Sequence, residues 1–218
     1  MGEKKKAGYL LDEKALRKRY PDSGLASDIC LPKEEELRLP CRNLAITYHL
    51  GGGIKYGSII EIQGEESTGK TLLSAEFGEV TQSLGGMVLW DDAESTFDGP
   101  WLASHGLDLK KVELLPYENQ IELVSDWMAD MIPFYRNKLT HNEPILLVVD
   151  SIALFEGADS LETADTDARA EMGKRSFLMG RLLRKRMKFF AKYGVCVILI
   201  NQIRKKIGAS MFEDPDTT

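Results

Sequence analysis

The stretch best suited to chemistry is an eight-residue loop, Gly64-Glu65-Glu66-Ser67-Thr68-Gly69-Lys70-Thr71, which fits the spacing G-x-x-x-x-G-K-[ST]. Its two glycines let backbone N–H groups turn inward on a polyphosphate, and a helix that begins at the loop adds the positive end of its dipole. The Lys70 ammonium can then reach the β- and γ-phosphates, while the Thr71 hydroxyl can bind Mg²⁺. The spacing therefore predicts a nucleotide site, most simply one for ATP or GTP.

Carboxylates follow two apolar runs of the sequence. Asp150 comes directly after the run 145–149, so it is expected at the tip of a buried strand, where an acidic residue can orient Mg²⁺ beside a phosphate-binding loop. Glu94 follows a shorter run and can polarise the water that attacks a γ-phosphate. On spacing alone, Asp91 and Asp92 compete for that role or merely cap the strand. The Ser151 hydroxyl could assist Asp150, and a helix-capping role for Asp150 or Ser151 stays open.

An amide pair, Asn201-Gln202, follows the last apolar run. A neutral amide at the tip of a strand can hydrogen-bond a γ-phosphate and respond to its loss without adding charge. A polar strand end exposed to water explains the same pair equally well, so the chemistry of the two residues leaves both interpretations open.

Positive charge is concentrated near the C-terminal end of the sequence. Residues 172–210 carry eleven Lys or Arg and no Asp or Glu, which leaves −17 for the rest of a chain whose net charge is −6. In the helical stretch 171–193, basic and apolar side chains recur on different faces. A solvated basic face explains one such helix, but a basic loop with interleaved apolar residues follows it, and together they indicate binding to a polyanion such as single-stranded DNA.

The elements that must hold these side chains alternate between strands and helices. Strands alternating with helices predict an α/β fold with a mostly parallel, doubly wound sheet, helices on both faces and ligands at the carboxyl ends of the strands. Residues 1–40 are expected to form a separate arm and linker, with a short charged helix at 10–20. A disordered tail and a segment that docks on a neighbouring subunit both stay open for this arm. The expected strands are 58–63, 87–90, 112–115, 145–149 and 195–200, the expected helices are 71–83, 120–139 and 171–193, and a polar loop is expected at 156–170.

The composition excludes several classes of protein. A chain of 218 residues with 43% hydrophobic and 28% charged residues suits one globular core. No apolar run approaches the roughly 18 residues that span a membrane, and the first six residues lead into no signal-type stretch. The three cysteines, Cys30, Cys41 and Cys196, are odd in number and widely spaced, which predicts free thiols rather than a disulfide or zinc framework.

Taken together, the motifs resemble those of the RecA family of DNA strand-exchange recombinases. The resemblance runs from about Asn43 to Thr218, and its strongest parts are the loop 64–71, Asp92-Ala93-Glu94, Val148-Val149-Asp150-Ser151 and Asn201-Gln202-Ile203-Arg204-Lys205-Lys206-Ile207-Gly208. The last of these is much more specific than a phosphate-binding loop. It implies a P-loop NTPase with a RecA-like core at 41–218, after the arm and linker at 1–40. Because the family's sheet continues beyond its second DNA-binding loop, we expect the chain to be truncated within that loop.

The resemblance also implies ATP and Mg²⁺ as cofactors and gives roles to single residues. Glu94 would activate water, Lys70 would act on the phosphates, and Gln202 would link the γ-phosphate to the DNA-binding loop. Thr71 and Asp150 would be the metal ligands. The implied nucleotide-contacting residues are Gly64, Glu65, Glu66, Ser67, Thr68, Gly69, Lys70, Thr71, Leu72, Asp98, Trp101 and Asp150, with Trp101 stacked on adenine and Asp98 at its amino group; the implied DNA-contacting residues are Arg184, Arg204, Lys205, Lys206, Ile207, Gly208 and Phe212.

The expected function is that of an ATP-dependent recombinase that forms a head-to-tail filament on single-stranded DNA, pairs it with double-stranded DNA and promotes strand exchange. The expected location is the cytoplasm of a bacterium or of a phage-infected host, with no membrane partner. Two alternatives stay open: a RecA-fold ATPase of another kind, such as a helicase-like motor, or a truncated DNA-binding subunit that does not hydrolyse ATP. Hydrolysis stimulated by single-stranded DNA would favour the first function, ring-shaped particles the motor, and ATP binding without turnover the subunit.

Overall fold

The computed structural model describes residues 18–19, 36–155 and 168–203, with the side chains of 168–176 and 178 left out of the description. The chain divides into two compact units, residues 1–36 and 37–218. In the first unit only Lys18, Arg19 and Glu36 are described, and the first two are helical. Apart from those two residues, the predicted arm helix at 10–20 lies outside the described residues.

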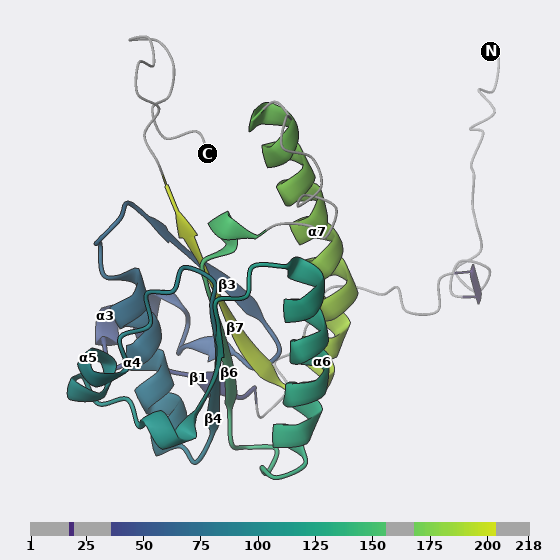
Figure 1. The fold of residues 1–218 in the computed structure, drawn as a ribbon. Coiled ribbons are helices and arrows are strands. Elements are labelled where there is room, and N and C mark those ends of the chain that lie inside the picture. The colour runs from purple at the N-terminus through teal and green to yellow at the C-terminus, as the bar shows by residue number, and fades with distance from the viewer. Residues whose placement is uncertain (1–17, 20–35, 156–167, 204–218) are drawn as a thin grey trace, which may run out of the picture. The chain divides into compact units, whose positions relative to one another are not determined.

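Five parallel strands form the central sheet of the second unit, in the order β3-β7-β6-β4-β5. The chain enters at one edge, crosses to the other half of the sheet, and returns to the centre with its last two strands (Figure 1). This topology confirms the predicted α/β fold with a parallel sheet. The strands are β3 (Ile59–Gly64), β4 (Met87–Asp92), β5 (Val112–Pro116), β6 (Ile145–Asp150) and β7 (Val195–Gln202).

Helices cover both faces of the sheet (Figure 1). On one side lie α4 (Lys70–Ser83) and the short α3 (Leu44–His49) and α5 (Gly99–Ser104), and on the other lie α6 (Ile121–Arg136) and α7 (Ala168–Tyr193). A small antiparallel pair, β1 (Arg38–Leu39) and β2 (Ile54–Lys55), stands apart from the main sheet. No helix in the described part of the chain is long and apolar enough to cross a membrane.

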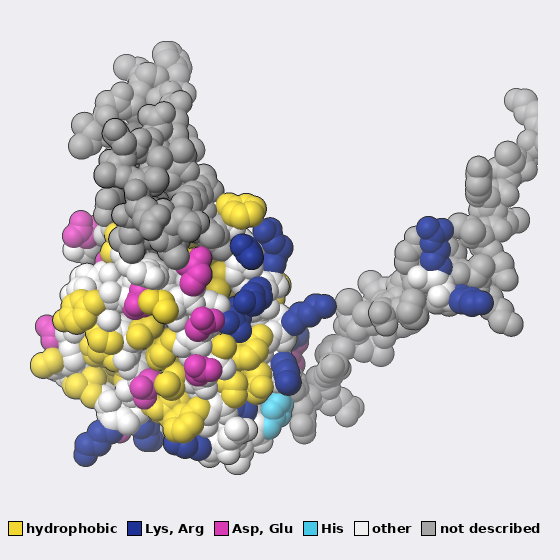
Figure 2. All heavy atoms as spheres, turned by 45° about the vertical axis from the view of Figure 1, so that its right-hand side comes forward, with side chains coloured by type: hydrophobic (Ala, Val, Ile, Leu, Met, Phe, Trp, Pro, Cys, Tyr) yellow, Lys and Arg dark blue, Asp and Glu magenta, His cyan; other side chains and the backbone are white. Residues whose placement is uncertain are grey.

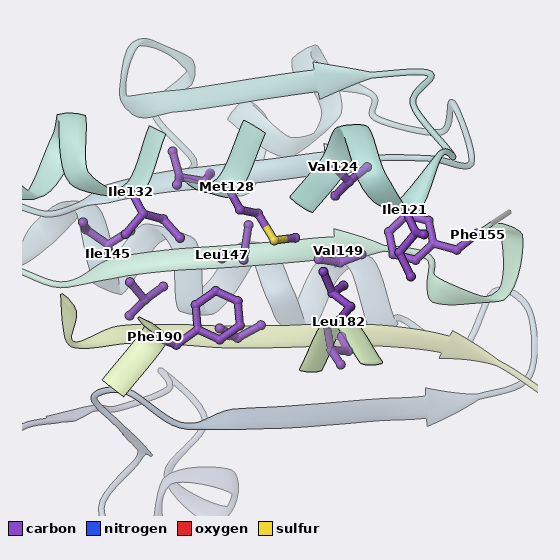
Figure 3. Close-up of a cluster of buried hydrophobic side chains, with 14 of the residues drawn as sticks. Ile121, Val124, Met128, Ile132, Ile145, Leu147, Val149, Phe155, Leu182 and Phe190 are labelled. Carbon is purple, nitrogen blue, oxygen red and sulfur yellow. The ribbon is translucent and has the colours of Figure 1, made fainter. Parts of the chain in front are cut away.

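The two helical layers explain why β6 is one continuous apolar run. Its side chains alternate between two cores, so every residue from Ile145 to Asp150 is buried. Leu147 and Val149 pack against α6 and α7 in the core that Figure 3 shows, whereas Leu146 and Val148 pack in the core beneath α4. The central strands are therefore held from both sides, and their carboxyl ends form a firm edge for a site.

The structure corrects several predicted boundaries. Strands β4 and β7 run two residues further than expected, because backbone pairing continues through the polar residues at their ends. Helix α7 begins at Ala168, inside the predicted loop 156–170, where Ala and Arg are good helix formers; residues 156–167 lie outside the described part. Helix α6 ends at Arg136 rather than at 139, because the N–H groups of Lys138 and Leu139 bond to Tyr135 O in a closing turn.

Several short elements have no counterpart in the sequence prediction. They are β1, β2, α3, α5 and two 3₁₀ turns, η1 (Leu109–Lys111) and η2 (Ile152–Leu154). Each has two to six residues, which is too few to show a helical or strand period. Helix α5 matters most among them, because it carries an aromatic residue of the site.

Candidate functional site

A pocket of about 420 Å³ opens at the carboxyl edge of the sheet, where ligands bind in parallel α/β folds. This volume lies within the range of small-molecule sites. The pocket brings together eleven of the residues singled out in the sequence and adds Thr96 and Ile200. Its lining consists of Glu66, Ser67, Thr68, Gly69, Lys70, Thr71, Leu72, Glu94, Thr96, Trp101, Asp150, Ile200 and Gln202.

The glycine loop runs from the end of β3 into α4. Gly69 has φ +86°, a left-handed conformation that side chains rarely adopt, and it immediately precedes the helix. The Lys70 ammonium donates to the carbonyls of Gly64 (3.1 Å) and Glu65 (2.7 Å). Gly64 and Glu65 thus position Lys70 through their carbonyl groups but do not line the pocket themselves. The first residues of α4 do line it, so their backbone N–H groups can bind an anion there.

Thr71 and Asp150 meet across the pocket floor. The Thr71 hydroxyl donates to Asp150 Oδ2 at 2.9 Å, so a hydroxyl and a carboxylate oxygen stand together at the phosphate loop. Burial raises the pKa of Asp150 to about 6; the Thr71 hydrogen bond and Lys70 lower it, while Glu94 and Asp92 raise it further. These hard oxygen donors in a negative setting fit Mg²⁺, which binds proteins through one or two oxygen ligands plus phosphates and water.

The described residues contain no metal centre larger than this pair. In the described residues, no group of three or more His, Cys, Asp or Glu is arranged to hold an ion. A divalent cation at Thr71 and Asp150 would therefore complete its coordination with phosphate oxygens and water. The donor set matches a nucleotide-bound cation better than an ion enclosed by protein ligands.

The three carboxylates after the β4 apolar run have different surroundings. Asp92 accepts hydrogen bonds from the N–H groups of Thr96 (2.9 Å) and Phe97 (3.1 Å), so it shapes the turn that follows. Asp91 is completely buried on the α6 side, its oxygens have no hydrogen-bond partner among the described residues, and burial raises its pKa to about 8. Of the three, only Glu94 lines the pocket.

Two contacts tie Glu94 to the end of β6. Its backbone N–H donates to Asp150 O at 3.2 Å, and its Oε1 accepts a hydrogen bond from the Ser151 hydroxyl. The residue proposed to activate water therefore lies next to the residue proposed to hold the metal. Sequence spacing suggested both roles separately but gave no indication of this link.

The two amides at the end of β7 also separate. Gln202 pairs in register with Gly64 and lines the pocket, and the N–H of Ile203 donates to Gly64 O at 3.1 Å. Asn201 instead donates to Glu61 Oε1 at 2.9 Å, outside the pocket lining. Asn201 thus fits the polar strand end, whereas Gln202 is placed to contact a ligand.

Trp101 enters the pocket on α5. The Asp98 carboxylate accepts a hydrogen bond from Trp101 N–H at 2.9 Å and caps this helix. The indole is 41% exposed, and the His105 ring lies beside it with 4.5 Å between centroids. Asp98 itself is exposed and does not line the pocket, so the structure brings Trp101 but not Asp98 to the site.

Sequence reasoning missed two residues of the pocket lining, Thr96 and Ile200. Thr96 lies in an irregular turn fixed by Asp92, and Ile200 belongs to a strand whose apolar residues otherwise fill a core. Neither residue type carries a motif. The only available signal was position, because each lies within two residues of a predicted site residue, Glu94 or Gln202.

The basic residues of α7 do not form a uniformly positive surface. Arg181 and Lys185 share a groove of about 370 Å³ with the acidic Glu122 and Asp126 of α6, and Figure 2 shows basic and acidic side chains alongside each other on this face. Arg184 is exposed. The predicted DNA-contacting residues Arg204, Lys205, Lys206, Ile207, Gly208 and Phe212 lie outside the described residues.

Arg186, in contrast, is buried. It donates to Ser125 Oγ through Nε (3.1 Å) and Nη2 (2.8 Å), and Nη2 also bonds to Ser125 O (2.8 Å). These bonds join α7 to α6. Arg186 is therefore a structural residue, whereas the other basic side chains described on α7 are exposed.

Comparisons with known proteins give one consistent match. Residues 29–218 match the family model of the RecA N-terminal domain. The chain is 34% identical over 197 residues to Protein RecA of Geobacter sulfurreducens, 32% over 219 residues to that of Aquifex aeolicus, and 34% over 221 residues to that of Thermotoga petrophila. The alignments cover 89%, 100% and 99% of this chain, and 54%, 60% and 58% of those proteins. The chain thus spans little more than half the length of the relatives it matches.

Proposed function

The chain belongs to the RecA family, and from that premise we propose that it binds ATP with Mg²⁺, hydrolyses it, and acts on DNA in homologous pairing and strand exchange. The observation that carries this proposal is one pocket that holds the phosphate loop, the Thr71–Asp150 pair, Glu94, Trp101 and Gln202 together. A site for a simple anion would need neither an aromatic wall nor a second carboxylate.

The binding step follows from the loop. Backbone N–H groups at the start of α4 and the Lys70 ammonium would hold the β- and γ-phosphates of ATP. Lys70 would exchange its contacts with the carbonyls of Gly64 and Glu65 for phosphate oxygens. Thr71 and Asp150 would hold Mg²⁺, which supplies neutralisation of phosphate charge when bound. Trp101 would offer its exposed indole face to adenine.

The hydrolytic step would use Glu94. Its carboxylate accepts a proton from, or orients, a water in line with the γ-phosphate, a role that needs a carboxylate facing the phosphates. Gln202 would hydrogen-bond the γ-phosphate from β7. Ile203 directly follows Gln202, and its N–H donates to Gly64 O. Loss of the contact between Gln202 and the γ-phosphate would therefore affect the backbone that continues into residues 204–212.

The proposed DNA contacts lie outside the nucleotide pocket. Arg184 and the basic and apolar residues at 204–212 would follow the phosphates and pack on the bases of single-stranded DNA. A head-to-tail filament, double-stranded DNA as second substrate and a cytoplasmic location belong to the same proposal, and family membership supports them. The mixed charges between α6 and α7 direct the DNA proposal to Arg184 and the stretch 204–212 rather than to the whole of α7.

ATP turnover with and without single-stranded DNA tests the proposal. We expect Mg²⁺-dependent ATP binding, hydrolysis that rises with DNA, and loss of roughly two orders of magnitude in kcat in Glu94→Gln. Glu122→Gln, an exposed carboxylate outside the nucleotide pocket, is the matched control and should hydrolyse ATP normally. Turnover that Glu94→Gln leaves unchanged would contradict the proposed role of this pocket, and unwinding by ring-shaped particles would indicate a helicase-like motor instead.

A further inference from the structure

Ser151 makes a contact that the proposed function does not use. It directly follows Asp150, it is completely buried, and its hydroxyl donates to Glu94 Oε1. Resting on the proposed function, we infer that Ser151 is a positioning residue that fixes the Glu94 carboxylate for attack on the γ-phosphate.

The hydroxyl of Ser151 has an obvious alternative that it does not take. Ser151 is the N-cap residue of η2, where serine commonly accepts a hydrogen bond from the backbone of the following turn. Here the side chain makes no capping bond, and only the carbonyl of Ser151 bonds to Leu154 N–H. The hydroxyl therefore bonds to Glu94 instead. If this bond were lost, a buried hydroxyl would have no acceptor, and the folded state would lose free energy of stabilisation.

The contact restricts a flexible side chain. A glutamate has three rotatable bonds, and one oxygen of Glu94 is held by Ser151 while the backbone N–H is held by Asp150 O. Glu94 lines the pocket, and its other oxygen, Oε2, has no hydrogen-bond partner among the described residues. Fixing a catalytic group in this way removes entropy before the reaction, so the effect should appear in the transition state rather than in nucleotide binding.

The pair 150–151 thus serves both parts of the proposed site. Asp150 accepts from Thr71 on the metal side, and Ser151 donates to Glu94 on the water side. Two consecutive residues of one strand end would set the separation between the metal ligand and the water-activating group. This arrangement predicts that Ser151 acts only through Glu94.

A double-mutant cycle tests this inference with Mg²⁺, ADP and aluminium fluoride, which together mimic the transition state. Ser151→Ala should leave ADP affinity within about twofold and weaken binding of the ADP–aluminium fluoride complex by roughly tenfold or more, with a similar fall in kcat and little change in KM. In Glu94→Gln the same substitution should have no further effect. Ser151→Cys, which keeps a weak donor of similar size, should be intermediate.

Control measurements separate positioning from folding and from the proposed function. Thr81→Val removes another buried hydroxyl, which bonds only within α4 to Phe77 O, and should change neither affinity. Unfolding curves show whether each variant is folded; if Ser151→Ala is not, Ser151→Cys carries the test. Equal mimic affinity in wild type and Ser151 variants, or an equal loss in the Glu94→Gln background, would overturn the inference. A wild-type chain that binds no ADP would overturn the proposed function, and the inference with it.

Discussion

The Thr71 hydroxyl donates a hydrogen bond to Asp150 Oδ2 over 2.9 Å, and it joins two residues that are 79 positions apart in the sequence. The contact unites the first turn of α4 with the tip of β6. The structure therefore holds the phosphate loop next to Asp150. The two oxygen atoms proposed to bind Mg²⁺, one from Thr71 and one from Asp150, are adjacent.

Thr71 substitutions test that pairing. Thr71→Val keeps the shape of the side chain but removes the hydroxyl oxygen proposed to bind the metal, and we expect Mg²⁺-dependent ATP affinity to fall by roughly tenfold or more. Thr71→Ser keeps the hydroxyl and should bind almost as wild type. Calorimetric titration with ATP at fixed Mg²⁺ measures both, and equal affinity in the valine variant would argue against a metal role for Thr71.

Trp101 should report nucleotide binding by fluorescence. Of the three tryptophans, Trp90 is fully buried and Trp127 packs partly against the α6–α7 core, whereas Trp101 is 41% exposed and lines the pocket. Adding ATP or ADP should change emission in wild type and in Trp127→Phe, but not in Trp101→Phe. Trp101→Ala should also lose roughly tenfold in affinity, because stacking of a base is worth about 1–3 kcal/mol. A full response in Trp101→Phe would place the base elsewhere.

Asp91 should make folding stability depend on pH. Burial, and after it the charges of Asp92, Glu118 and Asp150, raise its pKa to about 8 in the folded state from an ordinary 3.8. Between these values the folded chain binds more protons than the unfolded chain, so the contribution of Asp91 to stability is fully present below pH 4 and is lost as pH rises to about 8.

Urea unfolding at pH 5 and pH 8 measures this effect. Wild type should lose on the order of a few kcal/mol over that interval, while Asp91→Asn, which cannot ionise, should lose much less. Asp130→Asn is the matched control, because Asp130 is an exposed carboxylate on α6, and its profile should follow wild type. The same pH dependence in Asp91→Asn and wild type would assign the titration to another group.

Two arginines of α7, two positions apart, should separate stability from DNA binding. Arg186→Ala loses the hydrogen bonds to Ser125 and should lower the free energy of unfolding by about 1–3 kcal/mol. Arg184 is exposed, so Arg184→Ala should change the free energy of unfolding by less than about 0.5 kcal/mol. The affinity of this variant for single-stranded DNA should fall and depend less steeply on salt. The opposite pattern would exchange the roles assigned to the two residues.

The fold was largely predictable because its signals are periodic or motif-based. Continuous apolar runs such as 145–149 can be buried only between two layers, and the spacing of Gly64, Gly69 and Lys70 belongs to a known backbone geometry. Edges of the elements were less accurate, since hydrogen-bond ladders continue through polar residues such as Asp92 and Gln202 without a compositional signal.

The site was only partly predictable because it depends on contacts between distant segments. Spacing left Asp91 and Asp92 in competition with Glu94, and the structure separates the three: Asp91 lies in the core, Asp92 holds a turn and Glu94 lines the pocket. The use of the Ser151 hydroxyl depends on where Glu94 lies. The sequence around Ser151 and around Glu94 does not indicate that these two residues are in contact.

The pairing of β3 with β7 has a thermodynamic consequence. Gly64 of the phosphate loop lies in register with Gln202 and accepts a hydrogen bond from Ile203 N–H. If ATP and DNA bind as proposed, both ligands would therefore act on the same pair of strand ends. Coupling of this kind is reciprocal. If bound ATP raises the affinity for DNA by some factor, bound DNA must raise the affinity for ATP by the same factor. The coupling can therefore be measured through either affinity.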